Sequence, residues 1–492
     1  MGIVLKQSSR NTIIIYAAFF FGGINALFLY TRFLKEEYYG LVTYLLSMAN
    51  LLMPLTAFGV QYTIVKFYSS YTSKIQRDRF LSTALFVPLF IATPIAFFGN
   101  LFYNEIATYL SKKNAIIRDY TFIIYLVAVT TAYFEIFYSW SKVQLKSVFG
   151  NVLKELYNRI AVMILLFLVF YKVINQVAFI YCLTAAYFLR MFIMMLYAFK
   201  LYRPKFSFSF PDNYKELISY SIYIILAGSA GAILLDIDKV MIPAKKAIEY
   251  TAYYSVAVYI GSVIEAPGRA MSHILQPLTA KALNENNMPE VANLYKRSSI
   301  NLILVCGFIF LLINANVIEL YKILPEKYSG GILIVLVISL AKLYSMFLGN
   351  NGAIVSNSKY YKILLPYGIA MALSVYFLNA WLIDEMGIYG AALSTLIVIT
   401  FFNTLKMWYV YHKFRMTPFT SKTMILIFII AILYLIFYFI NFGFHPILNM
   451  LLKGMLITGI YLILVVQLKI SNDMNVFLRK LFRFNSFTKN NQ

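Results

Sequence analysis

The chain has 492 residues, of which 61% are hydrophobic and only 13% are charged. Soluble proteins are typically about one-quarter charged, so this composition excludes a soluble globular protein and indicates a polytopic membrane protein. The formal net charge of +23 would suggest nucleic-acid binding in a soluble protein. In a membrane protein it indicates loops that face anionic phospholipids, and we expect no nucleic-acid partner.

Membrane spans are the main predicted elements, because a span needs about 20 mostly apolar residues. The sequence contains fourteen runs that meet this criterion. In chain order they lie at 11–31, 40–62, 80–100, 118–141, 156–172, 177–198, 217–241, 250–268, 298–318, 330–350, 361–382, 387–410, 422–441 and 446–468. The predicted fold class is therefore an all-α polytopic membrane protein with two six-helix lobes and a carboxyl-terminal helix pair.

The predicted domains follow from this series of spans. They are an N-terminal six-helix lobe at 1–200, a second six-helix lobe at 201–416, an additional helix pair at 417–470 and a basic tail at 471–492. A weak internal repeat favours two related lobes, because segments 35–54 and 246–267 both begin with charged, Tyr-rich sequence and both end in proline. Duplicated parallel lobes are a known transporter architecture, with the substrate path between them.

The basic residues of the loops predict the orientation in the membrane. When each loop Lys and Arg is assigned to the nearer membrane face, 29 lie on the side of the amino terminus and 11 on the opposite side. Because cytoplasmic loops carry an excess of Lys and Arg, we predict that both termini are cytoplasmic. The tail contains "NVFLRKLFRFNSFTK" and is expected to form a helix on the anionic inner leaflet.

Two cations lie near the middle of predicted spans, Arg190 in "TAAYFLRMF" and Lys342 in "VISLAKLYS". A cation at this depth costs at least about 2.5 kcal/mol on insertion scales, so it usually faces a cavity or a partner. One lies in each predicted lobe, and together they would suit an anionic head group such as a diphosphate. The alternatives are an intramembrane ion pair or a side chain that extends to the interface. Glu135 in the fourth span could partner Arg190, or take up a coupling proton or cation.

Further carboxylates are candidates for ion coupling or charge pairing. Asp236 and Lys239 are three residues apart, and Glu265 and Arg269 are four apart, so each pair shares a helical face and is expected to interact. Asp236 and Asp238 also spell the D-x-D of metal-dependent glycosyltransferases. No nucleotide-binding domain accompanies this motif, so Asp238, like Asp236, is interpreted as a candidate for ion coupling or charge pairing.

Small residues open the twelfth predicted span, at Gly387, Gly390, Ala391 and Ala392. Glycine costs a helix roughly 1 kcal/mol relative to alanine, so a cluster of this kind needs a reason. Small residues allow helix backbones to approach closely in membranes. The cluster therefore predicts a helix start that packs tightly against a neighbouring helix.

Catalytic and metal-binding motifs are absent from the sequence. It contains no G-x-x-x-x-G-K-[ST] phosphate loop and no H-E-x-x-H, and both Cys182 and Cys306 lie within apolar runs. We therefore expect neither an enzyme nor a cofactor or metal site. Any transport energy is expected from a proton or sodium gradient.

Four stretches carry a family resemblance. They are "LYTRFLKEEYYGLVTY", which includes Arg32; "LLDIDKVMIPAKKAIEYTAYYSVAV", which includes Asp238 and Lys239; "GNNGAIVSNSKYYK"; and "LNAWLIDEMGIYGAALST". They resemble segments of the bacterial polysaccharide exporters, the oligosaccharide-lipid flippases of O-antigen and capsule assembly. That family shares a superfamily with the lipid II flippase and the multidrug and toxic-compound extrusion transporters.

The resemblance implies an inverted-V transporter of twelve core helices plus two, whose lobes rock to expose a cationic cavity to alternate sides. It implies that Arg32, otherwise an interfacial anchor, contributes to this cavity, and that the small residues after 386 pack within the C-terminal lobe. The implied substrate is an undecaprenyl-diphosphate-linked oligosaccharide, moved from the cytoplasmic to the outer leaflet of the bacterial inner membrane. The polysaccharide polymerase of the same pathway is an expected partner.

Three other functions stay open at this point. A lipid II flippase shares the fourteen-helix plan and the cationic cavity. A drug or cation exporter of the same superfamily typically has twelve helices, and both the extra helix pair and the cations Arg190 and Lys342 argue against it. A membrane glycosyltransferase or polymerase generally needs a large external loop, and the longest predicted outer loop spans only 101–117.

Overall fold

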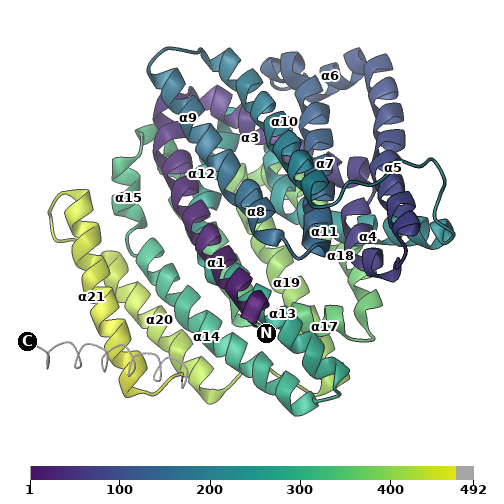
Figure 1. Ribbon diagram of the computed structural model, residues 1–492. Coiled ribbons are helices and arrows are strands. Elements are labelled where there is room, and N and C mark those ends of the chain that lie inside the picture. The colour runs from purple at the N-terminus through teal and green to yellow at the C-terminus, as the bar shows by residue number, and fades with distance from the viewer. Residues whose placement is uncertain (1, 472–492) are drawn as a thin grey trace, which may run out of the picture. The chain divides into compact units, whose positions relative to one another are not determined.

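The computed structural model describes residues 2–471, and within this range its regular elements are all helices (Figure 1). The first part of the chain holds α1 (Gly2–Gly23), η1 (Ile24–Leu29), α2 (Tyr30–Phe33), α3 (Glu36–Ala57), α4 (Val60–Phe67), η2 (Tyr68–Ser70), α5 (Lys74–Leu101), α6 (Tyr103–Ser111), η3 (Ala115–Tyr120), α7 (Thr121–Val143), α8 (Ser147–Val152), η4 (Leu153–Tyr157), α9 (Asn158–Phe170), α10 (Gln176–Leu201), α11 (Tyr214–Lys245) and α12 (Glu249–Ser262). The second part holds η5 (Val263–Glu265), α13 (Ala266–Asn284), α14 (Met288–Asn314), α15 (Val317–Ile323), η6 (Glu326–Gly331), α16 (Ile332–Phe347), α17 (Asn351–Asn357), η7 (Tyr361–Ile363), α18 (Leu364–Met386), α19 (Ile388–Phe414), α20 (Ser421–Phe439) and α21 (Pro446–Gln467). The segments η1 and η4 are π-helical, and the other η segments are 3₁₀ turns.

Twelve helices of the described residues are long and apolar enough to cross a membrane, which confirms a multi-pass all-α architecture. The remaining two predicted spans, 156–172 and 250–268, are also helical but shorter. Their main helices are α9, with 13 residues, and α12, with 14 residues. The count of fourteen spans therefore stays a prediction.

The described residues form two compact units. Unit 1 comprises the chain up to Val256 together with Ile363–Thr395, and unit 2 comprises Ala257–Lys362 together with the chain from Leu396 onward. The predicted domain bounds at 200, 416 and 470 stay predictions. Only the first residue of the predicted basic tail at 471–492 lies within the described residues.

Unit 1 is organised around α7, which packs against α3, α4 and α10. Helices that are apolar all round are usually buried, and α7 carries no charged residue before Glu135. Its Phe134 and Trp140 are fully buried in the core of the unit, next to Phe80 of α5. In the same unit, α11 packs against α3 and α18.

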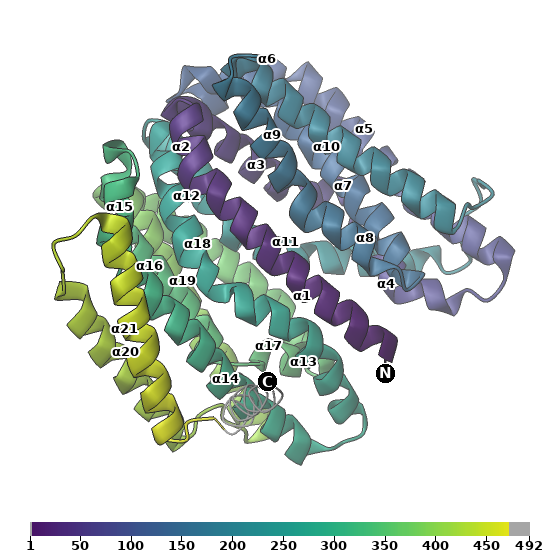
Figure 2. The same cartoon turned by 60° about the vertical axis from the view of Figure 1, so that its left-hand side comes forward.

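Unit 2 is organised around α14, which packs against α13, α16, α20 and α21. All five helices are labelled in Figure 2. The predicted final helix pair is present as α20 and α21, and its apolar side chains share one core with α14. Tyr461 of α21 is buried there, and its hydroxyl donates a 2.7 Å hydrogen bond to the backbone oxygen of Leu304. The pair is thus packed into this unit, rather than attached to it only by the chain.

The small-residue cluster lies at the tight connection between α18 and α19, within unit 1. Gly387 adopts a φ of +61°, a left-handed conformation that favours glycine. A Cβ atom on Gly390 would lie 1.9 Å from the backbone oxygen of Leu382, so no side chain fits at this position. Ala391 and Ala392 are fully buried. This geometry explains why the cluster contains small residues.

Replacing Gly390 by alanine is expected to destabilise the protein by about 1–3 kcal/mol, because the methyl group must displace backbone rather than a flexible side chain. The midpoint of thermal unfolding in detergent measures this effect. Gly99 of α5 is the matched control, since a Cβ there has no atom within 4 Å. A Gly390→Ala protein as stable as Gly99→Ala would contradict the close approach.

Candidate functional site

A charged cavity of about 580 Å³ lies within unit 1. Its walls come from α1, η1, α2, α3, α7, η4, α9, α10 and α11. The polar side chains that line it are Asn25, Tyr30, Asn50, Thr131, Glu135, Lys154, Glu155, Asn158, Arg159, Tyr187, Arg190 and Asp236. Ionisable groups at this density within apolar helices indicate a functional site.

Both π-helical segments of the described chain contribute to the cavity wall. Asn25 comes from η1, and Lys154 and Glu155 come from η4. The amide nitrogen of Asn25 donates a 2.7 Å hydrogen bond to the backbone oxygen of Arg159, just after η4, so the two segments are tied together. Single π turns inside α-helices are rare and occur frequently at functional sites.

Each carboxylate of the cavity has a cationic partner. Lys154 lies 2.6 Å from Glu135. The other two pairs are Arg159 with Glu155 at 3.4 Å and Lys239 with Asp236 at 2.9 Å. The Asp236–Lys239 pair is therefore present as expected from the spacing, whereas Glu135 has Lys154, not Arg190, as its ion-pair partner.

Arg190 is the exception among the cavity cations. Its side chain is buried and lies over the rings of Phe134 and Tyr187, at 4.2 and 4.8 Å from their centroids. Within the described part of the chain, no carboxylate lies within 4.0 Å of it, and its Nε atom is buried without a hydrogen-bond partner. One terminal nitrogen donates a long 3.4 Å hydrogen bond to Thr131. A buried guanidinium held by aromatic faces and without a carboxylate can accept an anion from outside the protein.

The other two candidate cations lie elsewhere. Arg32, in α2, is exposed and does not line this cavity. Lys342 belongs to unit 2, where its Nζ lies 2.8 Å from Oε1 of Glu265. Arg269 lies 3.4 Å from the same oxygen, as the four-residue spacing led us to expect. Lys342 thus adopts the ion-paired alternative, within a cluster of two cations and one carboxylate.

Asp238 occupies a second polar site in unit 1, away from the charged cavity. Its buried carboxylate accepts hydrogen bonds from the hydroxyls of Tyr254 and Thr395, the latter at 2.8 Å, and from the amide nitrogen of Asn379 at 2.6 Å. No described Lys or Arg lies within ion-pair distance of it. The amide oxygen of the same Asn379 side chain, Oδ1, is buried without a hydrogen-bond partner.

The D-x-D interpretation as a glycosyltransferase motif finds no support in this geometry. Asp236 accepts hydrogen bonds from Ser47 and Asn50 of α3 at 3.0 and 3.1 Å, whereas Asp238 contacts α12, α18 and α19. The two carboxylates therefore do not share a site. Among the described residues, no cluster of three or more His, Cys, Asp or Glu side chains could hold a metal ion.

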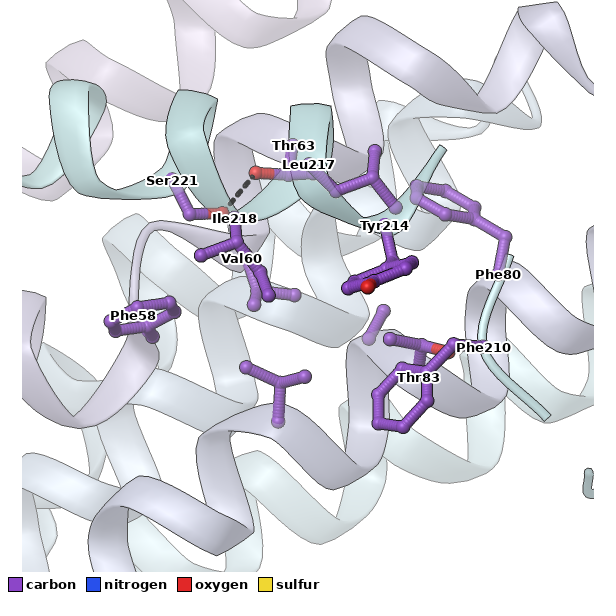
Figure 3. Close-up of a pocket in the computed structure, with 12 residues that line it drawn as sticks. Phe58, Val60, Thr63, Phe80, Thr83, Phe210, Tyr214, Leu217, Ile218 and Ser221 are labelled. Atoms are coloured by element: carbon purple, nitrogen blue, oxygen red, sulfur yellow. Dashed lines mark hydrogen bonds between the residues drawn. The ribbon is translucent and has the colours of Figure 1, made fainter. Parts of the chain in front are cut away.

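A further cavity lies between α4, α5 and the start of α11 (Figure 3). Figure 3 shows its lining of aromatic and aliphatic side chains, including Phe58, Phe80 and Tyr214, and the 2.9 Å hydrogen bond between Thr63 and Ser221. Its volume of about 40 Å³ leaves room for only a few water molecules. Because it has no charged lining, we do not assign function to it.

Several residues of these sites are missing from the sequence-based candidates. Lys154 and Arg159 lie near a predicted loop boundary, where a cation is ordinary. Lys154 is revealed by its partner Glu135 on α7, and Arg159 by its position in the wall of the cavity. Asn379 and Thr395 are uncharged, and nothing in their local sequence links them to Asp238. Only the carboxylate of Glu135, which lies within the fourth predicted span, could have suggested a nearby cation.

Comparisons with known proteins agree with the described architecture. The model of a family described as polysaccharide biosynthesis protein matches residues 8–266, more than half of the chain. A structure of the lipid II flippase MurJ in an inward closed conformation matches with a TM-score of 0.67 and 15% identity, over 96% of this chain and 99% of that one. No curated protein sequence matches the chain.

Two transporter structures of the multidrug resistance MATE family also match. An inward-facing MATE transporter of the MOP superfamily gives a TM-score of 0.63 at 12% identity, over 82% of this chain and 98% of that one. The MATE transporter DinF-BH gives 0.59 at 12% identity, over 84% of this chain and 95% of that one. At these identities the likeness establishes the fold.

Proposed function

Since the chain belongs to the polysaccharide biosynthesis protein family, we propose that it is a flippase for undecaprenyl-diphosphate-linked oligosaccharides. It moves the repeat unit from the cytoplasmic to the outer leaflet of the bacterial inner membrane by alternating access, for the synthesis of O-antigen or capsule. The fold that it shares with the lipid II flippase and MATE transporters supports a transport function.

The observation that carries this proposal is the environment of Arg190. Every carboxylate of the charged cavity already has a cationic partner, and Arg190 is left with an unpartnered Nε. A diphosphate supplies the missing negative charge, with oxygens that can accept two hydrogen bonds from one planar guanidinium. A drug exporter that carries cations would gain nothing from this group.

The proposed energy source is a gradient of protons or sodium ions, coupled through Asp238. A carboxylate without a basic partner can bind either ion, and the hydroxyls of Tyr254 and Thr395 and the free Oδ1 of Asn379 are further oxygens of the kind that monovalent cations accept. This site contains residues of α11, α12, α18 and α19. Ion binding there would bias how these helices pack.

We further propose that both termini are cytoplasmic, as the excess of basic residues on that side suggests. The polysaccharide polymerase of the same pathway is the proposed protein partner, and anionic phospholipids are proposed to contact the basic loops. No catalytic role is assigned to any residue.

A strain that lacks this protein is expected to accumulate complete undecaprenyl-linked repeat units with their sugars facing the cytoplasm. Extraction of the lipid-linked glycans, followed by mass spectrometry and protection from an impermeant glycosidase, measures both properties. Truncated units would contradict the proposal and indicate an enzyme that acts earlier. Complete units that already face outward would indicate a polymerase or ligase, and lipid II in place of glycan units would indicate a lipid II flippase.

A further inference from the structure

An uncharged polar cavity of about 300 Å³ lies within unit 2, between α13, α14, α16 and α17. The polar side chains that line it are Ser272, Gln276, Ser345, Asn350, Asn351 and Ser356. One wall is apolar and consists of Leu275, Leu302 and Met346. Since no charged side chain is among the lining residues, the cavity suits a neutral ligand with several hydrogen-bonding groups and an apolar face.

Asn351 gives independent evidence for a ligand. Its side chain is only 7% exposed, and its amide nitrogen is buried without a hydrogen-bond partner within the described part of the chain. The neighbouring Asn350 is satisfied, because its backbone N–H donates to Ser298 and its side chain donates to Thr279. A buried donor without an acceptor is unfavourable, so an acceptor from a bound molecule would relieve it.

The cavity lies about one helical turn from the charged cluster of unit 2. On α16, Ser345 and Met346 follow Lys342 by three and four residues, and on α13, Gly268 precedes Arg269 directly. Lys342, Arg269 and their shared Glu265 carry one net positive charge.

We propose that this cavity is a sugar subsite, which binds the hydroxyl and amide groups of one monosaccharide of the lipid-linked glycan. In this subsite the amide of Asn351 donates to a sugar oxygen, and the apolar wall packs against the face of the sugar ring. The inference rests on the proposed function and adds to it, because it assigns recognition of the glycan to residues of unit 2. Selection between glycans then depends on an uncharged pocket rather than on the cations.

Gly352 of α17 offers a direct test. It lines the cavity, and a Cβ atom built on it has no atom within 4 Å, so a larger side chain can enter the cavity without a clash at its first atom. The purified full-length protein in nanodiscs is titrated with two probes. One is the undecaprenyl-linked glycan extracted from the deletion strain, and the other is undecaprenyl diphosphate without sugar.

In the wild-type protein the sugar is expected to raise the affinity about tenfold or more. Gly352→Leu is expected to remove this gain and to leave the affinity for undecaprenyl diphosphate unchanged. Asn351→Leu should reduce the gain in the same direction. Gly99→Leu of α5, where a Cβ also has no atom within 4 Å, is the control of equal bulk and should retain the gain.

The outcomes separate this inference from the function on which it rests. If the wild-type protein binds both probes equally, or if Gly352→Leu retains the full gain while its thermal midpoint shows that it is folded, the sugar subsite is wrong and the flippase proposal stands. If neither probe binds the wild-type protein, the proposed function fails, and the subsite fails with it.

Discussion

Replacement of Arg190 by glutamine is expected to lower glycan export about 100-fold at an unchanged level of folded protein. Glutamine retains hydrogen-bonding groups but loses the positive charge and the planar contact with Phe134 and Tyr187. Because no carboxylate lies within ion-pair distance of Arg190, the substitution breaks no ion pair, and we expect the loss of export to reflect the lost contact with the anionic substrate. The measurement is surface glycan in the deletion strain that carries the variant, with the protein quantified in the membrane fraction.

Two further variants test whether the loss of export is specific to the guanidinium of Arg190. Arg190→Lys retains the charge but not the planar, bidentate geometry, so we expect partial export. Arg159→Gln removes a cation of the same cavity that already pairs with Glu155, and its effect should be less than about tenfold. Equal losses in Arg190→Gln and Arg159→Gln would indicate that the cavity needs positive charge in general. Wild-type export by Arg190→Gln would refute the anion site.

Replacement of Asp238 by asparagine is expected to slow transport at least about tenfold and to abolish its dependence on an ion gradient. Asp238 accepts hydrogen bonds from three donors, so the amide nitrogen of an asparagine at this position would face another donor. The neutral amide also lacks the negative charge that binds a cation, and it cannot take up or release a proton. Binding of the lipid-linked substrate should persist, because Asp238 does not line the charged cavity.

Proteoliposomes measure this dependence with a sodium gradient at constant pH and, separately, with a pH gradient in the absence of sodium. The stimulating gradient identifies the coupling ion. Asp384→Asn is the control, because Asp384 is an exposed carboxylate of the same unit that pairs with Lys245. If Asp238→Asn responds to a gradient as the wild-type protein does, the coupling site lies elsewhere.

The fold was largely predictable from the sequence, because the cost of polar backbone in a membrane makes long apolar runs nearly unambiguous. Twelve predicted spans correspond to long apolar helices. The two that do not are informative. The fifth, at 156–172, begins within the π segment η4, just after the charged Lys154 and Glu155, and the eighth is divided by the 3₁₀ turn η5 before Pro267. Local hydropathy cannot anticipate such interruptions.

The candidate sites were predictable only in part. The positions of Arg190, Lys342 and Glu135 within predicted spans identified them as candidates, because a charged side chain inside a membrane costs free energy in any fold. The partner of each charged side chain depends on contacts between helices that lie more than a hundred residues apart in the sequence, such as the contact between Asp238 and Asn379. Uncharged partners give no signal of their own until a structure places them beside the ion.

The π turns at 24–29 and 153–157 also affect how this chain is aligned with its relatives. A π turn holds about one residue more than an α turn, so every side chain beyond it is rotated by about 100° relative to an uninterrupted helix. An alignment to a relative with plain α-helices therefore needs a one-residue gap within each segment. Without these gaps, cavity residues such as Tyr30 and Asn158 would be matched to positions about 100° away around the helix, and conservation at the site would be underestimated.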